Sequence, residues 1–166
     1  MSLEEINSAA SPQTENQFRQ CCTSEAWIKR MVAGRPYADE SALRSAADQN
    51  WATLCEADYL QAFEGHPKIG DVSSLKEKYA NTKALAAGEQ SSVEQANEET
   101  LHKLARGNQD YEEKFGFIFI VCATGKSALE MSNLLQARLP NGRENEIKNA
   151  AEEQRKIFQI RIGKLL

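Results

Sequence analysis

Apolar residues recur at spacings of three and four along most of this chain, and residues that favour helix ends mark where these runs begin and end. Ser24 precedes "EAWIKRMV" and Gly34 follows it, which predicts a helix capped at both ends. Ser11, followed by a proline, predicts the start of an earlier helix. The same signals predict further helices from Ser41, up to Gly65, around Leu75 and Tyr79, from Val93 to Gly107–Asn108, over 127–139 and over 143–165.

The run "FGFIFIV", residues 115–121, is the one strand-like stretch. A short apolar run fits a buried strand or a buried helix equally well, so the pattern alone leaves both open. The chain has no internal repeat, low-complexity tract or evident linker. We therefore expect residues 1–166 to form one all-α domain, a multi-helix bundle.

Composition and charge exclude several kinds of partner. The net charge is −4, and no stretch gathers Lys and Arg into the stripe that binding to phosphates requires, so neither DNA nor RNA is expected. The N-terminus lacks the pattern of a signal peptide and no apolar run reaches membrane-spanning length, which predicts a cytoplasmic protein without membrane contact. The four cysteines lack metal or redox spacing and are expected to be reduced thiols. With two histidines, no His-x-x-Glu and no phosphate-binding glycine loop, neither a metal nor another cofactor is expected.

The segment "EGHPKIGD", residues 64–71, holds a histidine between Gly65 and Pro67. Proline disfavours the α conformation for the residue before it, so His66 should be extended, directly after a helix that ends at Gly65. The negative partial charge at a helix C-terminus favours imidazolium, which makes His66 a candidate proton donor near neutral pH. A loop histidine is more often an ordinary surface residue, and His102, in a periodic helix, is expected to be solvent-exposed in that way.

The segment "SSVEQ", residues 91–95, has two compatible interpretations. Ser91 and Glu94 fit a capping box, in which the serine caps a helix and the glutamate bonds back to the N–H of the cap. Capping alone explains both residues. The same helix N-terminus also offers N–H groups to an anion such as a substrate carboxylate.

The last helix places two polar residues, Gln154 and Arg161, on the face that should be buried. That face follows from the spacing of Ile147, Ala150, Ala151, Gln154, Ile157, Phe158, Arg161 and Leu165. A buried guanidinium needs an anion, unless its stem packs while its head reaches solvent. The anion is either a carboxylate of the protein or that of a ligand, which arginine can bind with two parallel hydrogen bonds.

Together, His66, Glu94 and Arg161 suit a small anionic substrate. Two other functions fit the same residues. One is a non-enzymatic helical module that binds a small carboxylate through Arg161. The other is a hydrolase in which His66 activates water.

Four motifs resemble one known family. These are "HPKIGD" from His66, "SSVEQ" from Ser91, "YEEKFGFIFIVCATGKS" from Tyr111 and the terminal "QIRIGKLL". They are similar, in the same order and over nearly the whole chain, to the 2-oxo-4-hydroxy-4-carboxy-5-ureidoimidazoline (OHCU) decarboxylases of urate breakdown. The resemblance implies an all-α bundle, in which residues 115–121 are not a sheet strand. It also implies decarboxylation of OHCU to (S)-allantoin without a cofactor.

The resemblance further implies roles for individual residues. The catalytic histidine, glutamate and arginine of the family fall on His66, Glu94 and Arg161. Its substrate contacts fall on Pro67, Ser91 and Gln95 and on the main chain at Val121, Cys122 and Ala123. Members of the family are often homodimers, which implies the same assembly here.

Overall fold

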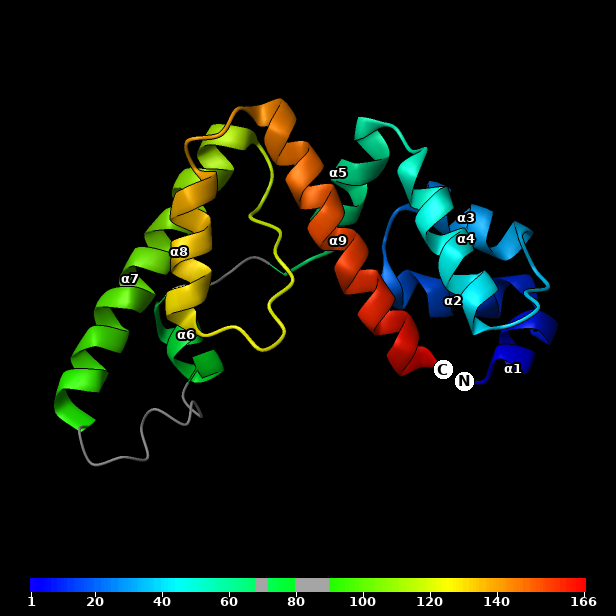
Figure 1. Cartoon of the computed structure of the whole chain (residues 1–166), viewed down its shortest axis with the longest axis horizontal. Helices are drawn as coiled ribbons and strands as arrows, with labels where there is room; N and C mark the ends of the chain where they lie inside the picture. The colour runs from blue at the N-terminus through cyan, green and yellow to red at the C-terminus, as the bar shows by residue number, and fades with distance from the viewer. Residues whose placement is uncertain (68–71, 80–89) are drawn as a thin grey trace. The chain divides into compact units, whose positions relative to one another are not determined.

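The computed structural model describes residues 1–67, 72–79 and 90–166, with the side chains of 78 and 90–97 outside the description. The described residues form α-helices and no strand, which confirms the all-α prediction. In chain order the helices are α1 (Leu3–Ser8), α2 (Ser11–Cys21), α3 (Glu25–Ala33), α4 (Glu40–Ala52), α5 (Glu56–Glu64), α6 (Val72–Tyr79), α7 (Gln90–Phe115), α8 (Ala128–Arg138) and α9 (Arg143–Leu165) (Figure 1).

The chain divides into two compact units. Unit 1 consists of Met1–His66, Ile120–Cys122 and Ile147–Leu166, and unit 2 consists of Pro67–Phe119 and Ala123–Glu146. Unit 1 therefore contains α1 to α5 and most of α9, and unit 2 contains α6, α7 and α8. That the whole chain acts as one domain stays a prediction.

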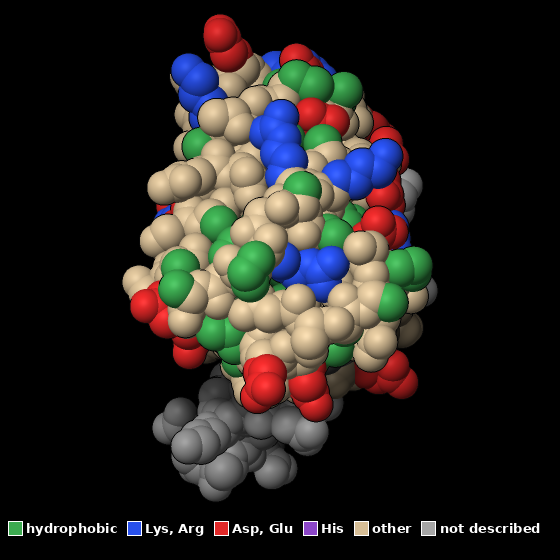
Figure 2. Space-filling view, turned by 90° about the vertical axis from the view of Figure 1, so that its right-hand side faces the viewer, with side chains coloured by type: hydrophobic (Ala, Val, Ile, Leu, Met, Phe, Trp, Pro, Cys, Tyr) green, Lys and Arg blue, Asp and Glu red, His purple; other side chains and the backbone are tan. Residues whose placement is uncertain are grey.

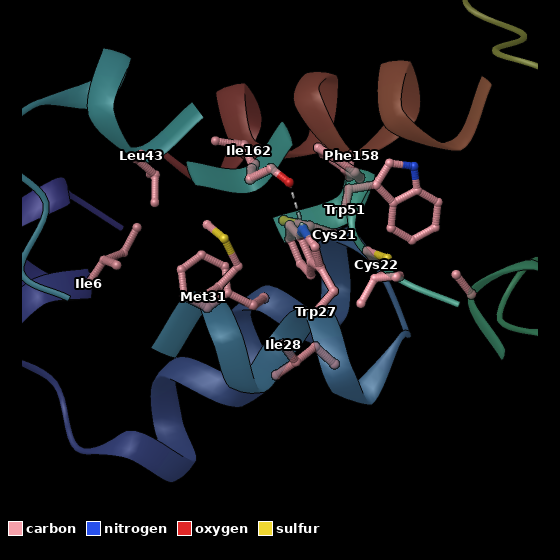
Figure 3. Close-up of a cluster of buried hydrophobic side chains, with 14 of the residues drawn as sticks. Ile6, Cys21, Cys22, Trp27, Ile28, Met31, Leu43, Trp51, Phe158 and Ile162 are labelled. Atoms are coloured by element: carbon pink, nitrogen blue, oxygen red, sulfur yellow. Dashed lines mark hydrogen bonds between the residues drawn. The ribbon is translucent and has the colours of Figure 1, made fainter. Parts of the chain in front are cut away.

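The core of unit 1 is an aromatic cluster from α2, α3, α4 and α9 (Figure 3). The Trp27 ring lies 5.0 Å from that of Phe158, centroid to centroid, and its indole N–H donates to the Ala47 carbonyl at 3.0 Å. The hydrogen bond satisfies the polar end of a side chain that is otherwise buried among apolar groups. The chain ends lie side by side, because the N-terminal ammonium of Met1 donates to the Leu165 carbonyl at 2.8 Å.

The capping residues in the sequence predicted most helix ends of unit 1 correctly. Ser24 caps α3 by accepting from the Trp27 N–H, as predicted. The cap of α2 is Ala10, so Ser11 begins that helix and does not cap it. The prediction also missed α1, which is six residues long and begins with a capping box between Ser2 and Glu5.

In unit 2, α7 continues through the glycine that was expected to end it. The predicted stop at Gly107–Asn108 is wrong, since α7 runs to Phe115. A Cβ at position 107 would lie 2.6 Å from Cδ2 of Leu135 in α8. The glycine therefore allows α7 and α8 to approach closely, and tertiary packing outweighs its weak helix propensity.

Residues 116–127, between α7 and α8, are neither helix nor strand. This confirms that residues 115–121 are not a sheet strand. The side chains of Phe117, Phe119 and Ile120 are nevertheless buried. Within unit 2, Phe119 packs against the Tyr111 ring at 5.3 Å, and the Tyr111 hydroxyl donates to the buried Glu146 carboxylate at 2.6 Å. The run is apolar because its side chains are buried, although its backbone forms neither a helix nor a strand.

Figure 2 shows one face of the molecule, on which Lys and Arg side chains are interspersed with Asp and Glu and hydrophobic side chains form small separate spots. This face lacks the single-sign basic stripe typical of nucleic-acid binding. Among the helices that the structure describes, none combines the length and the apolar character needed to cross a membrane.

Candidate active site

His66 lies directly after α5, as the sequence predicted. Gly65 is the C-cap of that helix, and the His66 N–H donates to the Phe63 carbonyl at 3.2 Å. Pro67 follows and is exposed. The backbone on both sides of His66 is therefore constrained, by the last turn of α5 before it and by the proline ring after it.

Thr23, in the connection between α2 and α3, packs against the end of α5. Its hydroxyl lies 3.3 Å from the carbonyl oxygens of both Gln61 and Ala62, in the last turn of α5. The Ala62 carbonyl also accepts from the Gly65 N–H, at 3.2 Å. A Cβ at Gly65 would lie 2.0 Å from Oγ1 of Thr23. Gly65 has an ordinary negative φ of −72°, so the position requires glycine for this close approach.

Gln154 of α9 holds the His66 ring. Its side-chain oxygen Oε1 makes a hydrogen bond with Nε2 of His66. Gln154 is fully buried at 0% exposure, while His66 is half-buried. The Nε2 amide group of Gln154 is buried as well and has no hydrogen-bond partner among the described residues. Sequence analysis placed Gln154 on the buried face of the last helix but assigned it no function.

Arg161 lies seven residues after Gln154, two helical turns along the same side of α9. Its Nη1 donates to the Cys21 carbonyl at the end of α2, at 3.3 Å. No carboxylate of the described residues lies within ion-pair distance of Arg161. Since a guanidinium carries five N–H donors, the side chain retains donors for an anion.

Burial governs the protonation of His66. Burial of the imidazole lowers the pKa of His66 from its ordinary value of 6.5, the hydrogen bond with Gln154 opposes this shift, and the positive charge of Arg161 adds to it. The expectation that the end of α5 favours imidazolium is therefore wrong. The last carbonyls of α5 already accept hydrogen bonds from Thr23 and from the main chain, and burial outweighs what remains of the helix dipole.

The thiols of Cys21 and Cys22 lie in the core of unit 1 (Figure 3), and both feel the positive charge of Arg161. Burial raises the pKa of Cys21 to about 11 and that of Cys22 to about 12, and the positive charge of Arg161 opposes both shifts. Both thiols are therefore neutral near pH 7 and cannot balance the guanidinium charge. We call His66, Gln154, Arg161, Cys21 and Cys22 the His66 cluster. It combines a neutral imidazole with a positive charge that no carboxylate of the described ranges compensates.

The other predicted site residues fall into two groups. The side chains of Ser91, Glu94 and Gln95, in the first turns of α7, lie outside the described residues. Because α7 begins at Gln90, Ser91 lies inside its first turn, and the prediction that Ser91 caps this helix is wrong. Val121 and Ala123 are half-buried, and between them the Cys122 N–H donates to the Glu153 carboxylate of α9 at 3.2 Å. His102 is exposed, as predicted.

A separate hollow in unit 1, of about 550 Å³, contains none of the predicted site residues. It is lined by Glu40, Ser41, Arg44, Ser45, Asp48 and Gln159. Its charged groups bind one another, with Arg44 and Glu40 2.9 Å apart, which leaves little to attract a ligand. Within the described ranges, no three His, Cys, Asp or Glu residues are grouped so that they could hold a metal ion.

Comparison with known proteins gives a consistent set of relatives. A family model described as OHCU decarboxylase matches residues 7–163. The chain is 32% identical over 151 residues to the uric acid degradation bifunctional protein TTL of Arabidopsis thaliana, which covers 91% of this chain and 47% of that protein. It is 22% identical over 164 residues to a 2-oxo-4-hydroxy-4-carboxy-5-ureidoimidazoline decarboxylase of Haloferax volcanii, covering 98% and 95% of the two chains.

A solved structure matches as well. The crystal structure of an OHCU decarboxylase in the presence of (S)-allantoin superimposes with a TM-score of 0.71 and 34% sequence identity, covering 90% of this chain and 96% of that one. The chain spans about half the length, or less, of the bifunctional relatives that it matches: 47% of the Arabidopsis protein and 32% of one from Bacillus sp..

The close contact at Gly65 gives a prediction about stability. Gly65→Ala should lower the free energy of unfolding by about 1 to 3 kcal/mol, because the new methyl group overlaps Thr23. Gly142→Ala is the matched control, since nothing lies within 4 Å of a Cβ there, and it should change stability by less than about 0.5 kcal/mol. Urea unfolding followed by tryptophan fluorescence measures both. Equal stability of the two variants would contradict the packing described here.

Proposed function

This chain belongs to the OHCU decarboxylase family, and we propose that it decarboxylates OHCU to (S)-allantoin in urate breakdown without a cofactor. The observation that carries the proposal is the His66 cluster, in which a neutral imidazole lies near an arginine that no described carboxylate neutralises. Such a site favours a small anion over a neutral or cationic ligand. The match to the OHCU decarboxylase family over residues 7–163 indicates that this anion is OHCU.

The reaction needs both the positive charge and a group that moves protons. The bond between the ring carbon and the carboxylate breaks, CO₂ leaves, and the bonding electrons move into the neighbouring C=N, whose nitrogen takes a proton. The resulting enol then loses its hydroxyl proton, and the carbon that bears the ureido group gains one. Because an anionic carboxylate leaves as neutral CO₂, the overall reaction consumes one proton. Protonation from one face of the ring gives the S configuration.

The residues of the His66 cluster divide these tasks. Arg161 binds the substrate carboxylate or the oxygens of its ureido group through the donors that Cys21 leaves unused. His66, neutral in the resting protein, accepts the hydroxyl proton and returns a proton to the ring. Because the surroundings disfavour imidazolium, the proton taken up by His66 is readily given back.

The remaining family positions complete the proposed site. Glu94 orients His66 or accepts from the ureido N–H groups. The other substrate contacts are Pro67, Ser91, Gln95 and the main chain at Val121, Cys122 and Ala123. We also propose that the protein is a cytoplasmic homodimer without a nucleic-acid partner.

Two other functions remain testable in the same assay. A helical module that binds a carboxylate through Arg161 would bind OHCU without converting it. A hydrolase that uses His66 to activate water would release a ring-opened product in place of CO₂. Measuring the product and its optical rotation separates the three.

The proposed activity predicts an optical signal. Urate treated with urate oxidase and then with the ring hydrolase yields OHCU, and this protein should accelerate its conversion to dextrorotatory allantoin, followed by circular dichroism. His66→Asn should reduce turnover by about a hundredfold to ten-thousandfold, since it removes general acid–base catalysis. His102→Asn is the control and should keep wild-type turnover, because His102 is exposed on α7. No acceleration over spontaneous decay by the wild type would contradict the proposal.

A second prediction separates catalysis by Glu94 from a structural role in α7. Glu94→Gln keeps the size and the helix propensity of the side chain, so the free energy of unfolding should change by at most about 1 kcal/mol. If the carboxylate acts in the reaction, turnover should nevertheless fall by about a hundredfold or more.

Ser91→Ala is the matched change one turn earlier in α7. Because alanine is the better helix former, this variant should not lose stability, and it should reduce turnover less than Glu94→Gln does. Wild-type turnover in Glu94→Gln would remove Glu94 from the reaction.

A further inference from the structure

Gln154 is a fully buried amide in the middle of an apolar helix face. The neighbours one turn away on that face, Ala150 and Phe158, are both at 0% exposure. The Oε1 atom of Gln154 forms a hydrogen bond with His66, and its Nε2 atom has no partner within the described part of the chain. A buried donor without a partner destabilises a protein, and an apolar side chain of similar size would avoid that cost. The contacts among the described residues therefore give no reason of stability for glutamine here.

The contact has a definite consequence for the imidazole. A side-chain carbonyl oxygen only accepts hydrogen bonds, so the His66 nitrogen that faces it must carry a hydrogen. A neutral imidazole has one N–H, and when that hydrogen is on Nε2 the lone pair is on Nδ1. The orientation of one amide thus decides which nitrogen of His66 can accept a proton.

We propose that Gln154 is a positioning residue, which fixes His66 as the tautomer protonated on Nε2 and leaves Nδ1 as the proton acceptor of the reaction. The tautomer itself is independent of any substrate. Its use in turnover rests on the decarboxylase function proposed above.

The surroundings of His66 support a neutral ring in one tautomer. Among the described residues, the charged group that acts on it is Arg161, whose positive charge disfavours imidazolium. Cys21 and Cys22, beside Arg161, are neutral thiols. The α5 main chain binds the His66 backbone N–H and leaves the ring to Gln154. In a serine protease triad, the wrong histidine tautomer costs about 10⁴-fold in turnover, so a group that selects the tautomer can matter as much as one that touches substrate.

Nitrogen-15 NMR of the imidazole rings tests the tautomer directly. The chain has two histidines, so His102→Gln assigns the signals of His66. In the wild type, Nε2 of His66 should show the shift of a protonated ring nitrogen and Nδ1 that of an unprotonated one. A wild-type His66 protonated on Nδ1 would overturn the proposal, because the amide would then present its NH₂ group to the ring.

Two substitutions of Gln154 test the cause. Gln154→Met keeps the volume but removes the acceptor, so the two His66 tautomers should become mixed and kcat should fall by about tenfold or more with little change in KM. Gln154→Glu keeps an acceptor for the Nε2 hydrogen and adds a negative charge. It should therefore keep the tautomer and move the pH dependence of kcat/KM that follows His66 to higher pH.

Gln159→Met is the matched control on the same helix. Gln159 donates to the Arg44 carbonyl and to Asp48, away from His66, so this variant should leave the His66 spectrum and the turnover unchanged. Wild-type tautomer and wild-type kcat in Gln154→Met would overturn the proposal. If the wild type lacks decarboxylase activity, the NMR result still decides whether Gln154 sets the tautomer, so the two proposals fail separately.

Discussion

The buried face of α9 is the constraint on which unit 1 depends. Phe158 and Ile162 on this face are completely buried and close the aromatic core formed with α2, α3 and α4. The same helix carries Gln154 and Arg161, two turns apart. Packing that excludes water from the apolar residues therefore also fixes the position of these two polar ones, one of which binds the His66 ring.

Much of the fold was predictable because its signals are local. Ser24 and Gly34 mark the ends of α3 in the sequence as they do in the structure, since capping involves neighbouring residues only. Helix α1 was missed because six residues are too short to show a period. The stop predicted at Gly107 was wrong because the glycine serves contact with Leu135, a residue distant in sequence.

The position of His66 was predictable from the sequence, but its protonation state was not. Proline and glycine around His66 indicated a constrained histidine after a helix, and the structure has it there. Its partner Gln154 lies 88 residues away, and periodicity could show only that this glutamine is buried. Thr23, which binds the end of α5, also comes from a distant segment. Burial of the ring lowers the pKa of His66 against the opposing hydrogen bond with Gln154, and this reversed the expectation of an imidazolium.

His66 is neutral near pH 7 beside Arg161, a cation that lacks a carboxylate partner within the described ranges. A neutral imidazole can accept the proton of the substrate hydroxyl, while the guanidinium attracts the substrate anion. An NMR titration of the imidazole C–H signals in the protein free of substrate, with the His66 signal assigned by His102→Gln, measures this state. We predict a midpoint for His66 below 6.5, the ordinary value for histidine. A midpoint above 6.5 would mean that His66 is stabilised as imidazolium and would contradict the account.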